Sequence, residues 1–180
     1  YLTLWKYGGI YLDLDVVVIQ SLEGLPPNYA GSESSRNVAA GVLSFSSEGT
    51  GHELAKLCLE DLRDNFRGSD WGYNGPGVIT RLLRRICGVE EAKDMLTEEC
   101  QGFKVYPTEA FYAIPWWNWT MYFDEGSTED VLSRSRSSYV IHVWNKHSVH
   151  NKIPIGARAP YLLFAQKYCP KVFEECDEFF

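Results

Sequence analysis

The chain has 180 residues, of which 45% are hydrophobic and 23% are charged, and its formal net charge is −7. These values are ordinary for a soluble globular protein, and we expect residues 1–180 to form a single domain. The negative charge and the scattered basic residues argue against a nucleic-acid partner. No apolar run reaches the roughly 20 residues that a membrane-spanning helix needs.

Apolar spacing and Gly/Pro breaks predict strands alternating with helices, which indicates an α/β fold. The helical segments expected in chain order are the end of a helix at 1–7 before Gly8, helices at 50–66 and from Pro76 to Gly88, a short helix from a capping box at 127–130, and a helix at 160–168. The expected strands are one or two at 10–19, then 38–45, 103–106 and 139–143, with an irregular aromatic segment at 111–119. The chain begins at Tyr1 inside a helical pattern, so we expect a fragment of a longer protein.

Five cysteines and one N-glycosylation sequon at Asn118 favour a secretory-pathway protein with one or two disulfides. Cys87–Cys100 and Cys169–Cys176 are the local pairings we expect first. Cys58 lies on the apolar face of a helix, where a buried free thiol is expected. The alternative is that all five cysteines are reduced and serve the core.

The most informative segment is the acidic pair Asp13 and Asp15, which follows two glycines and lies within an apolar strand pattern. In an extended chain both side chains would project from one face, with their Cα atoms roughly 6–7 Å apart, while Leu12 and Leu14 anchor the opposite face in the core. Two carboxylates this close repel each other, and a hard divalent cation such as Mn²⁺ or Mg²⁺ removes that penalty. The alternative is a pair of solvated aspartates at a strand end.

The segment W-K-Y-G-G-I-Y-L-D-L-D at residues 5–15 resembles the D-x-D region of the α-1,4-glycosyltransferases, which include galactosyl- and N-acetylglucosaminyltransferases. Three further segments resemble motifs of that family in the same order: W-G-Y-N-G-P at 71–76, P-T-E-A-F-Y-A-I-P-W at 107–116 and H-V-W-N-K-H-S at 142–148. Tyr168-Cys169-Pro170 is similar to the family's C-terminal end. The resemblance thus covers nearly the whole chain.

The resemblance implies a GT-A-type nucleotide-sugar-binding sandwich whose N-terminal portion is missing from this chain. It implies a retaining enzyme that moves a hexose, galactose first, from a UDP-sugar to a glycolipid of the lactosylceramide type or to a glycan, in α-1,4 linkage. UDP-N-acetylglucosamine and UDP-N-acetylgalactosamine remain open as donors. Members of the family are Golgi membrane proteins with lumenal catalytic domains, so a missing N-terminal membrane anchor is also implied.

By the same resemblance, Asp15 ligates the metal directly, and Asp13 contacts it through water or contacts the ribose and sugar. His142 is implied as a third metal ligand or as a donor to the diphosphate, with a satisfied structural histidine as the alternative. The expected donor-binding residues are Tyr11, Asp13, Gly75, His142, Trp144, Lys146 and Ser148.

Residues outside the acidic pair are expected to complete the reaction. Asn74, or else Asp70, would lie beside the donor sugar at a helix start, and Glu109 is a candidate acid on the acceptor side. Three tryptophans at 116, 117 and 119 would form an acceptor platform or pack in the core. Since no glycosidase-like pair of spaced carboxylates is evident, we expect a same-face displacement in which the leaving phosphate takes the acceptor's proton.

Two other functions fit parts of the sequence. The segment around Asp13 and Asp15 also resembles the first motif of haloacid-dehalogenase-type phosphatases, which use Mg²⁺. That interpretation leaves the later motifs unexplained. A sugar-binding domain without activity is the non-enzymatic alternative.

Overall fold

The computed structural model describes residues 1–96 and 100–180. The chain divides into two compact units, each made of two stretches of sequence. Unit 1 comprises Tyr1–Asp13 and Gly24–Thr108, and unit 2 comprises Leu14–Glu23 and Glu109–Phe180. The mixture of helices and strands confirms the expected α/β class, while the single domain expected from the sequence stays a prediction.

Unit 1 is built on a four-stranded sheet with the order β1-β4-β3-β5. Its strands are β1 (Gly9–Leu12), β3 (Tyr29–Ser32), β4 (Val38–Phe45) and β5 (Lys104–Tyr106). Strand β4 runs antiparallel to both β1 and β3, whereas β3 and β5 are parallel. The helical elements of this unit are α1 (Leu2–Tyr7), α2 (Gly49–Asn65), α3 (Pro76–Cys87) and the 3₁₀ turn η1 (Ala92–Met95).

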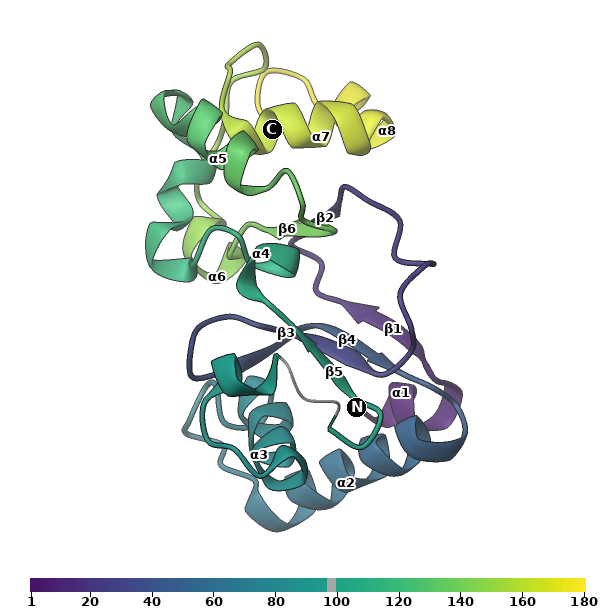
Figure 1. Cartoon of the computed structure of the whole chain (residues 1–180). Helices are drawn as coiled ribbons and strands as arrows, with labels where there is room; N and C mark the ends of the chain where they lie inside the picture. The colour runs from purple at the N-terminus through teal and green to yellow at the C-terminus, as the bar shows by residue number, and fades with distance from the viewer. Residues whose placement is uncertain (97–99) are drawn as a thin grey trace. The chain divides into compact units, whose positions relative to one another are not determined.

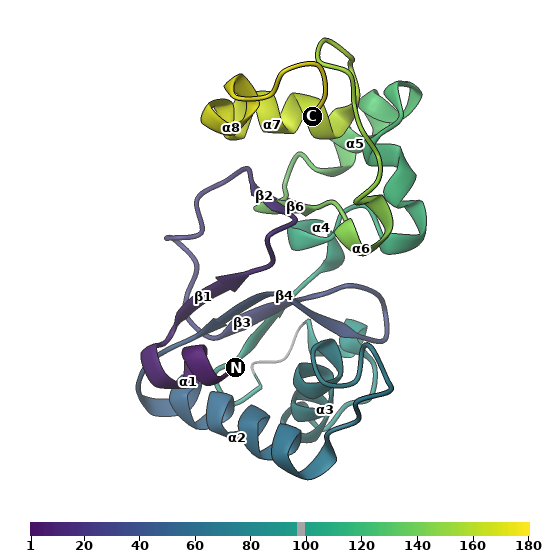
Figure 2. The ribbon, with the colours of Figure 1, turned by 180° about the vertical axis from the view of Figure 1, so that it is seen from behind.

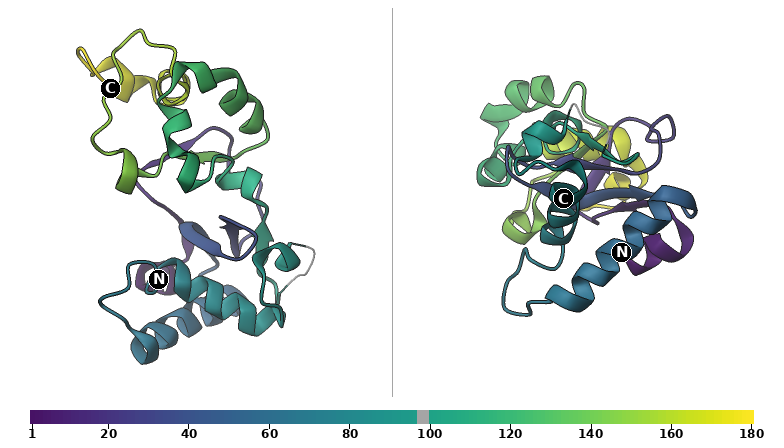
Figure 3. Two further views of the ribbon diagram at one scale, coloured as in Figure 1. Left: turned by 90° about the vertical axis from the view of Figure 1, so that its left-hand side faces the viewer. Right: turned by 60° about the horizontal axis from the view of Figure 1, so that its bottom comes forward.

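Helices α2 and α3 cover one face of this sheet (Figures 1 and 2). Figure 3 shows α1, in purple, lying alongside α2, in blue. The core between helices and sheet is apolar, with Leu54 and Ile79 meeting Leu43 and Phe45 of β4. The helical spacing of the apolar residues therefore predicted the buried faces of both helices.

Unit 2 contains a two-stranded antiparallel sheet made from β2 (Val16–Val18) and β6 (Val140–His142). Its helical elements are α4 (Thr108–Phe111, whose first residue belongs to unit 1), η2 (Trp116–Tyr122), η3 (Glu125–Ser127), α5 (Thr128–Arg134), α6 (Asn145–Ser148), α7 (Pro160–Tyr168) and α8 (Pro170–Glu174). Val17, Ile141 and Phe164 form a core with Ile114, Tyr122 and Val131. Within the described residues, no helix has both the length and the apolar character to span a bilayer.

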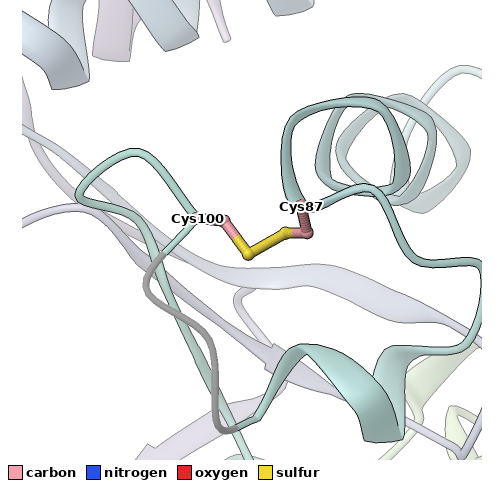
Figure 4. The surroundings of a disulfide bond; sticks show 2 residues. All are labelled: Cys87 and Cys100. Atoms are coloured by element: carbon pink, nitrogen blue, oxygen red, sulfur yellow. A yellow bond between two sulfur atoms is a disulfide. The ribbon is translucent and has the colours of Figure 1, made fainter.

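One disulfide joins Cys87, at the end of α3, to Cys100 (Figure 4). The local pairing predicted from the sequence is therefore confirmed. Cys58 is a buried free thiol, as expected. The predicted Cys169–Cys176 pairing is wrong, because both thiols are free. Helix α8 lies between these two positions, and a helix rises about 1.5 Å per residue, which holds its two ends apart.

Two further predictions from the sequence are wrong in detail. The segment 10–19 forms two short strands, β1 and β2, which is one of the two arrangements expected. The Asp-Leu-Asp stretch between them, however, is not extended but includes a turn at residues 14 and 15. Leu14 consequently points away from the core and is fully exposed. The expected capping box does not form at α5, because Ser127 donates its hydroxyl hydrogen to Asp124 and makes no side-chain cap bond.

Candidate active site

The pairing of β2 with β6 brings Asp15 next to His142. Val16 lies opposite His142 in the register, so Asp15 directly precedes the paired residue. The backbone N–H of Val143 donates to the Asp15 carbonyl at 3.0 Å, which extends the ladder by one bond. The two side chains therefore approach each other as a direct result of strand register, and His142 Nε2 lies 3.5 Å from Asp15 Oδ1.

The Asp15 carboxylate is oriented by a second contact. Its Oδ2 accepts a hydrogen bond of 2.7 Å from the backbone N–H of Asn145, the first residue of α6. A hydrogen bond from a backbone N–H fixes the direction of a carboxylate. Asp15 and His142 keep only 16% and 8% of their side-chain surface exposed. The carboxylate is therefore held in place while part of it stays open to solvent.

Trp144 sets the position of His142. It adopts a left-handed backbone conformation, with φ 56°, as the residue that precedes α6. Its backbone N–H donates to His142 Nδ1 at 3.2 Å, and its indole N–H donates to the Ile114 carbonyl at 2.8 Å. The two rings also contact each other, with centroids 4.3 Å apart. A left-handed residue other than glycine costs about 1–3 kcal/mol, and these three contacts offset that cost.

The hydrogen bond at His142 Nδ1 determines which ring nitrogen carries the proton when the ring is neutral. Because Nδ1 accepts a hydrogen bond, a neutral His142 ring carries its proton on Nε2, which faces Asp15. Direct metal coordination through Nε2 would move that proton to Nδ1, opposite the Trp144 N–H. The arrangement therefore favours His142 as a hydrogen-bond donor over His142 as a metal ligand.

Asp13, Asp15 and His142 each offer one potential metal-ligand atom, and these atoms lie within 4.8 Å of one another. Two features bring these residues together. Only Leu14 separates the two aspartates in the chain, and the pairing of β2 with β6 places His142 beside Asp15. Carboxylate oxygens suit hard cations such as Mg²⁺ and Mn²⁺. The donor set therefore fits a divalent cation held by the two carboxylates, with His142 beside it.

Besides Asp13, the predicted residues Tyr11, Asn74 and Gly75 belong to unit 1. The Tyr11 hydroxyl donates to Asp13 Oδ1 at 2.7 Å, and so orients that carboxylate. The Asn74 side chain binds the Arg67 backbone through both its oxygen and its nitrogen, at 2.9 and 2.7 Å, and closes a loop ahead of α3. The carbonyl of Gly75 accepts a hydrogen bond from the Tyr1 hydroxyl at 2.8 Å. The functional roles expected for Asn74 and Gly75 stay predictions.

The other predicted residues lie on α6 and η2 in unit 2. Lys146 is exposed on α6, one residue after the backbone N–H that binds Asp15. Ser148 is buried and donates its hydroxyl hydrogen to the Val143 carbonyl at 2.9 Å, so it fastens α6 to the end of β6. Asn118 is half-buried at a kink of η2, and its glycosylation stays a prediction.

The sequence did not single out three residues that support the site. Asn145 holds Asp15 through its backbone, and Tyr112 packs its ring against both His142 and Trp144, with centroids 5.7 Å away in each case. Burial raises the pKa of Tyr161 above its ordinary value, with Cys169 and Asp15 adding to the effect, so its phenol stays protonated at neutral pH. Asn145 and Tyr112 lie inside motifs that the sequence analysis recognised. Their roles could not be predicted, because any residue except proline has a backbone N–H and because a sequence does not show which rings pack together.

Comparison with known proteins gives two family matches. Residues 47–176 match the alpha 1,4-glycosyltransferase conserved region, and residues 1–33 match the glycosyltransferase sugar-binding region containing the DXD motif. No solved structure matches the chain.

Several curated relatives are similar over almost the whole chain. Lactosylceramide 4-alpha-galactosyltransferase of Rattus norvegicus is 36% identical over 93% of the chain and 45% of its own length. The protein of the same name from Pongo pygmaeus is 34% identical over 95% of the chain and 76% of its own length. The human alpha-1,4-N-acetylglucosaminyltransferase is 27% identical over 96% of the chain and 48% of its own length. The chain spans about half the length of most of these relatives.

Proposed function

The chain belongs to the alpha 1,4-glycosyltransferase family, and we propose that it is the part of a metal-dependent enzyme that moves galactose from UDP-galactose to a glycolipid or glycan acceptor. The observation that carries the proposal is the Asp15–His142 pair, which the register of β2 with β6 brings together. Asp15 lies in the region that matches the DXD sugar-binding family, and His142 lies in the region that matches the alpha 1,4-glycosyltransferase family. A GT-A architecture, a Golgi location and a membrane anchor in the rest of the protein belong to the same proposal. The disulfide supports an oxidising compartment.

Asp13 and Asp15 would hold Mn²⁺ or Mg²⁺. Such an ion supplies Lewis-acid stabilisation of a leaving diphosphate. Asp15 is already oriented by the Asn145 N–H, and Asp13 by the Tyr11 hydroxyl. Carboxylates fixed in this way need little rearrangement to accept a cation, which is the arrangement that favours tight binding.

The residues beside the carboxylates are suited to a diphosphate. His142 presents an Nε2–H on the side of Asp15, and Lys146 adds a positive charge on the neighbouring helix. Both stabilise negative charge that grows on the leaving group as the bond to the sugar breaks. We propose that the acceptor hydroxyl attacks from the same face and gives its proton to the leaving phosphate oxygen. Ser148 would act indirectly, by fastening the helix that carries Lys146.

Galactose is the first choice of donor sugar because the relatives with 34–36% identity are named as galactosyltransferases, while the relative named as an N-acetylglucosaminyltransferase is 27% identical. The same names suggest lactosylceramide as the first acceptor to test. N-acetylhexosamine donors differ by one N-acetyl group, which a few pocket contacts admit or exclude.

The proposal is tested by measuring UDP release from UDP-galactose and lactosylceramide, with Mn²⁺ or with EDTA, in the full-length protein. We expect turnover that requires Mn²⁺ and falls by at least about a hundredfold in Asp15→Asn, because the variant removes a charged ligand of the cation that would stabilise the leaving diphosphate. Asp177→Asn, which removes an exposed carboxylate in the C-terminal segment, is the matched control and should retain activity.

Three outcomes would change the proposal. Full turnover in EDTA, or in Asp15→Asn, would remove the metal site from the mechanism. Release of UDP only from UDP-N-acetylglucosamine would correct the donor sugar and leave the chemistry intact. Phosphatase activity with Mg²⁺, without any sugar transfer, would instead support the phosphatase hypothesis.

A further inference from the structure

Unit 2 exposes an aromatic surface formed by Trp116, Trp117 and His147, which we call the aromatic corner. Trp116 is 46% exposed and Trp117 is 57% exposed, although both are large apolar side chains. His147 is also exposed. Tryptophan is usually well buried because of its apolar area, so two adjacent exposed indoles mark a surface that favours a ligand.

The aromatic corner has a defined geometry. The Trp116 and His147 rings are stacked, with centroids 5.7 Å apart and an interplanar angle of 18°. Trp117 stands nearly perpendicular to Trp116, with centroids 5.6 Å apart and an angle of 84°. His147 therefore supports Trp116, and Trp116 supports Trp117, which keeps the larger exposed fraction of the two indoles.

Exposure of these two rings is built into the backbone of η2. The helix has a break at Asn118, where φ is −114° and ψ is 17°. After this break Trp119 turns to contact Phe123, and Tyr122 is completely buried in the core of unit 2. The same segment thus directs its later aromatic residues inward and leaves its first two outward, so the exposure of Trp116 and Trp117 does not result from a lack of local core.

The residues of the aromatic corner belong to the same two segments that support the candidate active site. His147 lies two residues after Asn145 on α6, and the Asn145 N–H holds the Asp15 carboxylate. The opposite side of the corner is also tied to the site, because the Trp144 indole donates to the carbonyl of Ile114, two residues before Trp116. A ligand on the corner would therefore lie against the two segments that fix Asp15 and His142.

We propose that the aromatic corner binds the acceptor, and that its ligand is a terminal β-galactoside whose apolar face stacks on Trp117. In galactose the hydrogens on C3, C4 and C5 form one continuous apolar patch, because the axial O4 points to the opposite face. Aromatic side chains offer a flat apolar surface that matches such a patch. Stacking in this direction leaves O4 uncovered, and O4 is the hydroxyl that an α-1,4 transfer requires. The inference rests on the proposed function.

A glucoside is the natural comparison, because its equatorial O4 and the hydrogen on its C4 interrupt the patch. The aromatic corner would therefore select galactosides over glucosides as acceptors, without a hydrogen bond to O4. His147 acts as a positioning residue that keeps Trp116, and through it Trp117, at a fixed angle.

The experiment uses the full-length protein with methyl β-lactoside as the soluble acceptor probe. We would measure binding by saturation-transfer NMR, together with transfer from UDP-galactose and the slower acceptor-independent hydrolysis of UDP-galactose. We expect the strongest saturation at H3, H4 and H5 of the terminal galactose. Trp117→Ala should raise the acceptor KM about tenfold, as expected for loss of one central aromatic contact, and should leave hydrolysis unchanged.

Further variants separate a binding role from a folding role. Trp117→Phe keeps a flat ring and should restore most of the acceptor affinity, and His147→Ala should raise the acceptor KM by less than Trp117→Ala. Phe179→Ala is the matched control, since Phe179 is an aromatic residue of the same unit with 49% exposure that lies outside the corner. It should leave the acceptor KM unchanged.

If the wild type transfers galactose, the proposed function is supported. In that case an unchanged acceptor KM in Trp117→Ala, or saturation centred on the glucose ring, would overturn the inference about the aromatic corner. Absence of UDP-galactose hydrolysis and of transfer in the wild type would instead reject the proposed function. In that case lactoside saturation that disappears in Trp117→Ala would still support the corner as a galactoside site, and lack of saturation would overturn it.

Discussion

Trp144 shows how a single residue links the parts of the candidate site. Its left-handed backbone turns the chain from β6 into α6, its N–H holds the His142 ring, and its indole reaches Ile114. The family resemblance implied that Trp144 binds the donor. In the structure its indole N–H already has a protein partner, so its main contribution is to orient His142.

Cys58 gives the chain a measurable response to alkaline pH. Burial raises the pKa of this thiol to about 12, whereas an unfolded cysteine ionises near pH 8.5. Above about pH 8.5 the unfolded state therefore binds fewer protons than the native state. The free energy of unfolding then falls as pH rises toward 12, by up to about 1.4 kcal/mol per pH unit from this group.

We expect Cys58→Ala to reduce the loss of stability between pH 8.5 and 10.5, measured by urea unfolding at a series of pH values. The quantity to compare is the slope of the free energy of unfolding against pH, because Cys58→Ala also loses packing contacts, and this loss is the same at every pH. Cys169→Ala, at a half-exposed thiol, is the control and should keep the wild-type slope. An identical slope in wild type and Cys58→Ala would show that the thiol does not resist ionisation in the native state.

At the scale of elements, Gly51 holds α2 close to the loop before it. A Cβ at this position would lie 2.5 Å from the Ser46 backbone nitrogen and would also overlap the Asn28 and Ser46 side chains. These groups are already joined, since Asn28 Oδ1 accepts the Ser46 N–H at 2.8 Å. In a helix with free space around it, Gly→Ala raises the free energy of unfolding by about 0.5–1 kcal/mol. At Gly51 the close contact makes the same substitution destabilising.

We predict that Gly51→Ala lowers the free energy of unfolding by at least about 2 kcal/mol, because the Asn28–Ser46 contact must break or shift. Gly24→Ala is the matched control, since nothing lies within 4 Å of its added Cβ. Urea unfolding of both variants measures the effect. Equal stability of Gly51→Ala and wild type would mean that the loop relaxes without cost.

Elements with strong local signals were predictable from the sequence. Helix α7 matches its expected range, 160–168, because Pro160 starts it and apolar spacing continues to Tyr168. Strand β3 was missed, since Tyr29–Ser32 is four residues long and ends in Gly-Ser, which carries little strand preference. Leu14 was misplaced because strand alternation was continued through a turn that no glycine or proline announces.

The candidate site was only partly accessible to sequence reasoning. Spacing alone indicated Asp13 and Asp15 as a metal-binding pair, since both lie in one short segment. The partnership of Asp15 with His142 came from the family resemblance, because residues far apart in the chain meet through strand pairing. The contact from the Asn145 backbone was unpredictable in principle, as any residue except proline carries the same N–H.

At the scale of the whole molecule, the chain carries net negative charge and holds two carboxylates close together at the site. Cation binding to the native state should therefore stabilise the protein, by about 2.7 kcal/mol when the cation is at a hundred times its Kd. We predict that Mn²⁺ raises the Tm of the full-length protein by several degrees and that Asp15→Asn abolishes this shift.

Asp177→Asn should keep the shift, since it removes an exposed charge away from the acidic pair. A shift of equal size in Asp15→Asn and wild type would assign the stabilisation to other carboxylates. This measurement needs no substrate, so it tests the cation site separately from the enzymatic activity.

Both compact units are discontinuous in sequence, and this has a consequence for synthesis on the ribosome. Strand β2 is made before α2 and α3, whereas its partner β6 and the Asn145 N–H are made after them. Asp15 must therefore wait, unpaired, while all of α2 and α3 are translated and free to fold. A nascent chain that stops between residues 108 and 139 would hold all of unit 1 but would lack β6 and Asn145, so Asp15 would have neither of the partners that orient it.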